Sequence, residues 1–113
     1  MIINFIISIY YNMTLYTLLK ADNPKKKYKV YIISKKTGRE KKIEFGSAGM
    51  SDFTIHKDEE RKLRYIKRHS ANENWNDAES AGYYSRYVLW NLPSIQASWR
   101  WVKNDLKRRG YIK

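Results

Sequence analysis

The stretch that decides the fold runs from Ser51 to His69 and reads SDFTIHKDEERKLRYIKRH. Ser51, Asp52 and Thr54 are residue types that cap free backbone N–H groups at the start of a helix. The acidic run at 58–60 follows in the first turns, where the helix dipole favours negative charge. The pattern therefore predicts a single helix over this stretch.

The predicted helix has two chemically different faces. Cations recur at intervals of four, three and four residues, which places them on one face. These cations are Lys57, Arg61, Arg64 and Arg68. A different and narrower apolar face carries Ile55, Leu63 and Ile66. We expect the apolar face to dock on the rest of the protein and the basic face to remain available to a ligand.

The charge balance points to a polyanionic partner. The chain has 113 residues, which fits one domain, and carries 23 Lys and Arg against 11 Asp and Glu, for a net charge of +12. Such an excess favours nucleic acid, anionic lipid or an acidic protein surface. The absence of cysteine excludes disulfides, thiolate chemistry and cysteine-ligated zinc.

The first nineteen residues, MIINFIISIYYNMTLYTLL, carry no charge and match a membrane span in length. Polar residues interrupt them, however, and they lack the basic n-region and cleavage site of a secretory signal, so we do not expect secretion. Three interpretations stay open: Met13 is the true start, the stretch packs on a neighbour, or it is a weak membrane anchor. We expect residues 1–27 to be an uncharged extension and basic linker, and residues 28–113 to form one small basic domain.

The stretch from Tyr28 to Phe45 predicts a β-hairpin. Strand-favouring or tolerated residues fill the first half, and in the second Ile43 and Phe45 lie on one face and Lys42 and Glu44 on the other. The turn KKTG ends in Gly38, where a positive φ is needed. The turn is also cationic, so it is either a solvated tip or a finger that contacts phosphates.

Two further helices are expected after a polar loop. Asp77 can cap a helix from Ala78 to Trp90, whose aromatic residues lie on several faces and so indicate burial. Ser94 can cap a third helix that ends near Gly110. Its apolar stripe is Ile95, Trp99, Val102 and Leu106. The predicted fold is α+β, with an N-terminal β-hairpin packed against about three α-helices.

The residues predict binding in preference to catalysis. His56 and His69 are thirteen residues apart, the chain has no cysteine and few clustered carboxylates, and the helix dipole accounts for the acidic run at 58–60, so neither a metal site nor a catalytic constellation is expected. No cofactor is expected either. Trp75, alone in a polar loop, is either an anchor in the core or an exposed platform for stacking, and Trp101 is a second candidate platform.

Three segments resemble a known group of proteins: FGSAGMSDFTIHKDEERKLRYIKRH, NENWND and AGYYSRYVLWNLPSIQAS. They are similar to small uncharacterised basic proteins encoded by large nucleocytoplasmic DNA viruses, the giant viruses of algae and amoebae. The resemblance covers roughly residues 26–109 and leaves residues 1–12 outside. The chain departs from the expected pattern at Tyr83-Tyr84 and at Leu92. The resemblance implies a viral setting and no catalytic residues.

The expected function is therefore that of a non-enzymatic basic viral protein that binds the phosphate backbone of nucleic acid, DNA before RNA, without base preference. The alternative is a minor capsid or other virion protein that binds acidic protein surfaces. Either would place the protein in the virion, or in the cytoplasm or nucleus of an infected cell. The candidate nucleic-acid-binding residues are Lys35, Lys36, Arg39, Lys57, Arg61, Arg64, Arg68, Lys103, Lys107 and Arg108.

Overall fold

The computed structural model describes residues 14–113. The predictions for residues 1–13, which include the alternative start at Met13 and most of the anchor segment, lie outside the described residues. Within residues 14–113, no helix is both long enough and apolar enough to span a membrane.

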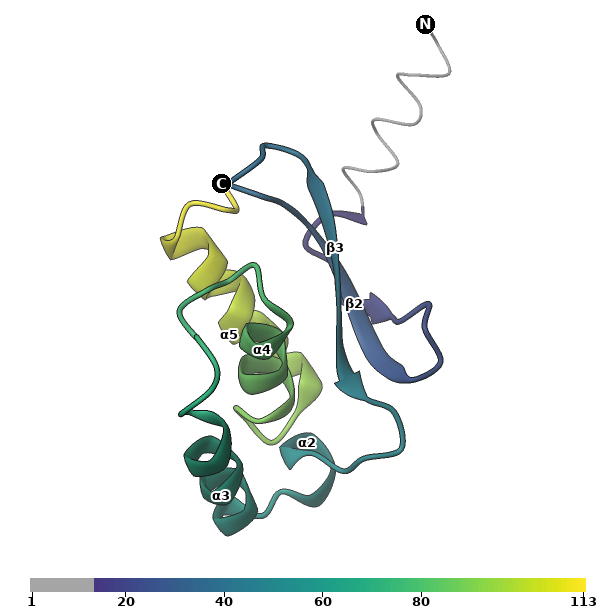
Figure 1. Cartoon of the computed structure of the whole chain (residues 1–113), viewed down its shortest axis with the longest axis vertical. Helices are drawn as coiled ribbons and strands as arrows, with labels where there is room; N and C mark the ends of the chain where they lie inside the picture. The colour runs from purple at the N-terminus through teal and green to yellow at the C-terminus, as the bar shows by residue number, and fades with distance from the viewer. Residues whose placement is uncertain (1–13) are drawn as a thin grey trace, which may run out of the picture.

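The centre of the fold is a three-stranded antiparallel sheet in the order β1-β2-β3 (Figure 1). Its strands are β1 (Leu19–Lys20), β2 (Lys26–Ile33) and β3 (Glu40–Ser47). β2 and β3 form the predicted hairpin, with Val30 opposite Ile43, and Gly38 in the turn has a φ of 72°. The short strand β1 was not predicted, because two residues carry too little alternation to indicate a strand.

One face of the hairpin is covered by helices, which confirms the α+β prediction. These are α4 (Ala81–Tyr84), the π-helix η1 (Ser85–Leu89) and α5 (Ile95–Arg108). The buried core joins sheet and helices, and its largest members are Ile32, Ile43, Phe45, Tyr83, Tyr84, Leu89 and Leu106. The third predicted helix is confirmed, since the Ser94 side chain accepts a hydrogen bond from the Ala97 amide and Gly110 follows the helix with a φ of 86°.

The predicted single helix from residue 51 to residue 69 is wrong, because the chain forms two helices here. They are α2 (Phe53–His56) and α3 (Glu59–His69). Lys57 between them has a φ of 54°, a left-handed conformation that ends α2. Asp52 caps α2, and Asp58 caps α3 by accepting hydrogen bonds from the first amides of that helix. The two aspartates thus mark two helix starts.

The predicted helix from Ala78 to Trp90 is also shorter and less regular than expected. It begins after Ser80, whose hydroxyl accepts a hydrogen bond from the Tyr83 amide at 3.2 Å. After one turn it becomes the π-helix η1. Single-turn π-helical segments are rare in proteins. Those that occur often lie at functional sites.

The packed part of the chain reaches back before residue 28. Tyr16 and Leu18 pack against the core, and the Tyr16 amide donates to the Tyr31 carbonyl at 2.9 Å. The Tyr16 hydroxyl in turn accepts a hydrogen bond from the Ile33 amide at 3.1 Å. Within the range predicted as extension and linker, Tyr16, Leu18 and β1 therefore contact the sheet or its core.

Candidate functional site

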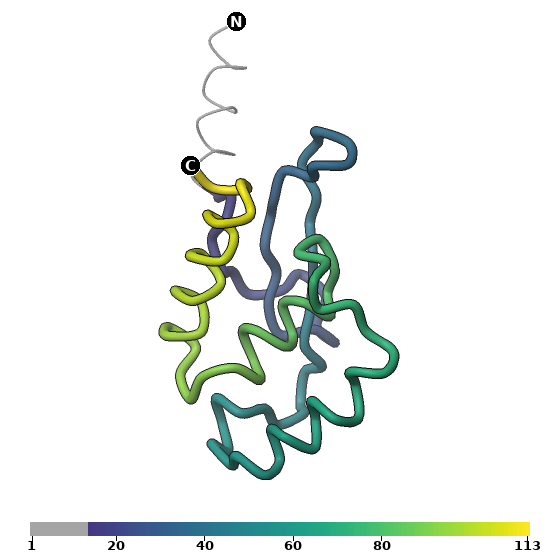
Figure 2. Tube along the Cα trace, turned by 90° about the vertical axis from the view of Figure 1, so that its left-hand side faces the viewer, coloured from purple at the N-terminus to yellow at the C-terminus, as the bar shows by residue number. Residues whose placement is uncertain are grey.

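The predicted nucleic-acid-binding residues fall into two regions at opposite ends of the molecule. The helix α3 lies at one end in both views, and the β2–β3 turn and the last turn of α5 lie toward the other (Figures 1 and 2). The candidate residues listed from the sequence are therefore divided between two regions of the structure.

Several cations at the turn end bind the protein's own groups. The Lys35 ammonium donates to the Arg109 carbonyl and lies 4.5 Å from the Tyr111 ring centroid. Lys36 pairs with Asp77 at 3.8 Å, and Arg108 bonds Asp105 at 2.8 Å. Of these contacts, that of Lys35 joins the hairpin turn to the end of α5, the exposed Lys36–Asp77 pair contributes little, and the Arg108–Asp105 bond lies within α5. Three further candidates, Arg39, Lys103 and Lys107, are exposed.

The arginines of α3 have a different environment. Arg61, Arg64 and Arg68 are all exposed. Arg64 lies 3.8 Å from Glu60, whose side chain is 86% exposed, a type of pair that contributes little. Within residues 14–113, no carboxylate lies within ion-pair distance of Arg61 or Arg68. Lys57, predicted on the same face, instead lies at the α2–α3 junction, where its ammonium donates to the Thr54 carbonyl at 3.1 Å.

The face by which α3 docks differs from the prediction. Leu63 and Ile55 are 61% and 62% exposed, whereas Tyr65 is the buried residue of α3. The Tyr65 ring lies parallel to the Trp90 ring, with centroids 4.3 Å apart and an interplanar angle of 3°. Ring stacking on a distant residue thus orients the helix, and the pattern of aliphatic residues does not reveal it.

The two candidate stacking residues are half-buried and already in contact with other side chains. The Trp75 indole donates to Glu73 at 2.8 Å and lies 6.4 Å from Tyr65. The Trp101 ring stacks on Tyr87 at 4.6 Å. Trp101 packs against the core, whereas Trp75 contacts Glu73 and Tyr65 outside it, so neither indole stands apart as an open platform.

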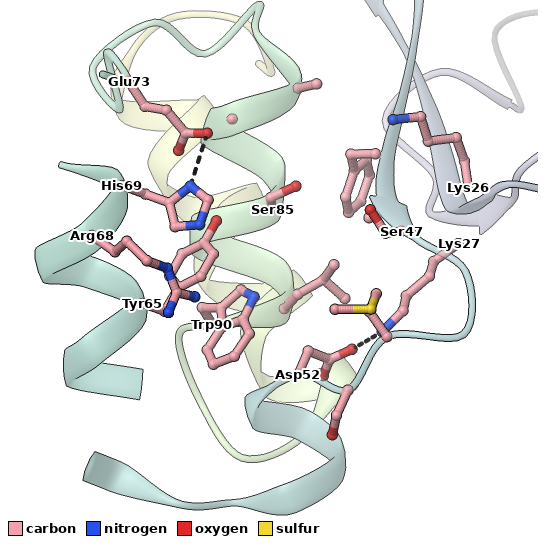
Figure 3. Close-up of a pocket in the computed structure, with 17 residues that line it drawn as sticks. Lys26, Lys27, Ser47, Asp52, Tyr65, Arg68, His69, Glu73, Ser85 and Trp90 are labelled. Carbon is pink, nitrogen blue, oxygen red and sulfur yellow. Dashed lines mark hydrogen bonds and ion pairs between the residues drawn. The ribbon is translucent and has the colours of Figure 1, made fainter. Parts of the chain in front are cut away.

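A cleft of about 420 Å³ opens between α3 and the end of the β2–β3 pair (Figure 3). Tyr65, Arg68 and His69 line it from α3. Lys26, Lys27, Ser47 and Asp52 line it from the other side, and Ser85 and Trp90 lie between the two walls. The cleft thus joins segments far apart in the sequence.

The charged groups of the cleft are only partly neutralised. The Lys27 ammonium bonds Asp52 at 2.5 Å, and His69 lies 3.5 Å from Glu73. Lys26 and Arg68 have no carboxylate within ion-pair distance among residues 14–113. The arrangement can therefore attract an anion to the rim of the cleft. Lys26, Ser47 and Ser85 were not candidates from the sequence, because no local pattern joins them.

The fold and the site together define a small basic α+β protein with a cationic helix beside a cleft. Residues 16–69, just under half of the chain, match a family of unknown function (DUF5754). Neither a curated protein nor a solved structure matches the chain. The match spans the sheet, α2 and α3, and so includes the α3 arginines. The setting in large DNA viruses stays a prediction, because the matched family is described only as being of unknown function.

No described residues form a metal site, since no group of three His, Asp or Glu side chains within residues 14–113 is placed to hold an ion.

Proposed function

We propose that the protein binds nucleic acid through the phosphate backbone and that α3 is its principal contact. The observation that carries the proposal is the exposure of Arg61, Arg64 and Arg68 on one helix, two of them without an acidic partner in the described part of the chain. An arginine already paired with an internal acid has less to gain from a phosphate.

The geometry of α3 suits a linear polyanion. Arg61 and Arg68 are seven residues apart, which corresponds to about 10 Å along a helix axis. Lys67, which was not a candidate from the sequence, adds an exposed cation in the last turn. Each phosphate neutralised by such a group releases counterions, so the affinity should fall steeply with salt.

The test is a salt titration of duplex DNA binding by fluorescence anisotropy. We expect Arg61→Gln/Arg64→Gln to lower the slope of log K against log salt by up to about 0.9 for each phosphate that the variant no longer neutralises. The matched control is Lys103→Gln/Lys107→Gln, which removes the same charge from exposed positions of α5.

We expect the control to change the slope by less than half as much. Absence of binding at low salt would overturn the proposal. Equal effects of the two double variants would overturn the assignment to α3.

A second candidate is an acidic protein surface, as in the virion alternative. The observation that favours it is Leu63, which is 61% exposed one turn before Lys67, since protein interfaces combine apolar and cationic groups. Polyglutamate is a suitable probe. This candidate replaces the first if polyglutamate binds as tightly as DNA at equal salt, and if Leu63→Ser weakens the binding of polyglutamate but not the binding of DNA.

A further inference from the structure

The cleft and the arginine face of α3 are continuous through one residue. Arg68 is the last arginine of that face and also lines the cleft (Figure 3). A polyanion that follows Arg61, Arg64 and Arg68 along the helix is therefore led to the mouth of the cleft.

The lining of the cleft combines the two kinds of surface that a nucleotide requires. Met50, which is 66% exposed, and the half-buried Trp90 give it an apolar part, and Lys26 and Arg68 give it cations that no carboxylate within residues 14–113 neutralises. Inorganic phosphate would use the cations alone. A phosphorylated nucleoside would use both, because its base offers an apolar face and its phosphate a charge.

Four hydroxyl groups that line the cleft, those of Ser47, Ser51, Tyr65 and Ser85, form no hydrogen bond within residues 14–113, and two of them lie at the ends of elements. Ser47 ends β3, and Ser85 is the first residue of the π-helix η1. In the part of the chain that the structure describes, neither side chain donates or accepts a hydrogen bond, although both line the cleft. Such a hydroxyl can donate a hydrogen bond to a phosphate oxygen, and it can donate to or accept from the edge of a base.

We propose that this cleft holds one unpaired nucleotide of the bound nucleic acid, with its phosphate at Lys26, its base against the apolar lining and the strand that leads to it at Arg68 on the opposite wall. The volume of about 420 Å³ suits a single nucleotide and excludes a double helix. The inference rests on the proposed function and specifies the form of the ligand: a duplex with a single-stranded end binds better than a blunt one.

The test compares two labelled probes with the full chain. One is a blunt DNA duplex, and the other is the same duplex with a short 5′-phosphorylated single-stranded overhang. We expect the overhang to bind about tenfold more tightly, the gain typical of one sequestered base. Free adenosine monophosphate as competitor separates a nucleotide site from one that requires a polymer.

The decisive variant is Lys26→Gln, with Lys25→Gln as its matched control. Both lysines are exposed, but Lys25 does not line the cleft. We expect Lys26→Gln to remove most of the preference for the overhang and leave blunt-duplex affinity within about twofold. Lys25→Gln should keep the preference. Arg61→Gln should weaken both probes equally and preserve their ratio.

The outcomes separate the two proposals. If the blunt duplex binds with a salt-dependent affinity and the overhang adds nothing, the cleft proposal is overturned and the proposed function stands. An equal loss of preference in Lys25→Gln and Lys26→Gln also overturns it. If neither probe nor the free nucleotide binds at low salt, both proposals fail. Competition by the free nucleotide that Lys26→Gln abolishes supports the cleft as the nucleotide site.

Discussion

At the scale of single residues, Glu79 is a buried carboxylate that is 4% exposed. Its two oxygens accept hydrogen bonds from the Ser34 hydroxyl at 2.6 Å, the Lys35 amide at 2.9 Å and the Tyr111 hydroxyl at 2.8 Å. One side chain thereby connects the hairpin turn with the C-terminal end of the chain.

Replacing Glu79 by Gln should destabilise the protein. The substitution replaces one acceptor oxygen by an NH₂ group, which faces either the Ser34 hydroxyl or the Lys35 amide and the Tyr111 hydroxyl, so at least one donor loses its acceptor in a buried site, at a cost of about 1–3 kcal/mol. Urea unfolding near neutral pH measures the change. A variant as stable as the original protein would show that these bonds contribute nothing net.

The same residue predicts a pH dependence. Burial raises the pKa of Glu79, but the bonds from Ser34, Lys35 and Tyr111 outweigh it, so the pKa lies below the ordinary value of 4.5. A depressed pKa in the folded state means that the stabilisation is complete above the ordinary pKa and is lost as the pH falls through the folded-state pKa. We expect unfolding free energy to fall below about pH 4.5, and to fall less steeply in Glu79→Gln. The expectation would be contradicted if the unfolding free energies of the two proteins fell equally steeply below about pH 4.5.

At the scale of elements, Gly46 fixes how β3 approaches η1. Its φ is 78°, and a Cβ atom at this position would lie 2.8 Å from the Leu89 Cδ1 atom. Gly49, in the following loop, has a similar φ of 83° but nothing within 4 Å of the corresponding Cβ position. A side chain at either glycine would strain the backbone, but only at Gly46 would it also clash with a neighbour.

Substituting Ala at these two glycines should give different losses of stability. Gly49→Ala should cost about 1 kcal/mol, from the left-handed backbone alone. Gly46→Ala should cost about 1–3 kcal/mol more, because the methyl group must displace Leu89. Thermal and urea unfolding of both variants give the comparison. Equal losses would show that Leu89 yields without cost.

The sequence predicted those elements whose signals are local. The hairpin followed from alternation and a glycine turn, and α5 from the Ser94 cap and a helical apolar stripe. The break at Lys57 escaped prediction because a lysine in the left-handed conformation leaves no compositional sign. The π-helix escaped because its hydrogen-bond register is decided by packing after the chain has folded.

At the scale of the whole molecule, the cations at the two ends have different surroundings, and we expect their replacement to have different effects. We expect Lys35→Gln to lower stability by about 1 kcal/mol, because its ammonium bonds the Arg109 carbonyl and lies over the Tyr111 ring. The same change should leave the salt dependence of DNA binding unaltered.

Arg61→Gln should behave in the opposite way, with unchanged stability and weaker DNA binding. Urea unfolding and salt titration on the same samples measure both quantities. A loss of DNA affinity in Lys35→Gln equal to that in Arg61→Gln would indicate one continuous binding surface over both ends.

Only the part of the candidate site that lies on one helix could be predicted from the sequence. Arg61, Arg64 and Arg68 share a helix, so their common face follows from spacing. Lys26, Ser47 and Ser85 lie on separate elements, and their meeting in one cleft depends on the tertiary packing. Long-range proximity of this kind has no counterpart in a local sequence pattern.

The parallel rings of Tyr65 and Trp90 also give α3 a spectroscopic signature. Tyr65 is the buried residue of this helix, and the centroid of its phenol ring lies 4.3 Å from that of the Trp90 indole. Electronic transitions of rings held this way couple, so near-ultraviolet circular dichroism should carry an exciton band that vanishes when α3 swings away. Such a local opening, which costs less than global unfolding, could then be followed optically without any label while a ligand is added.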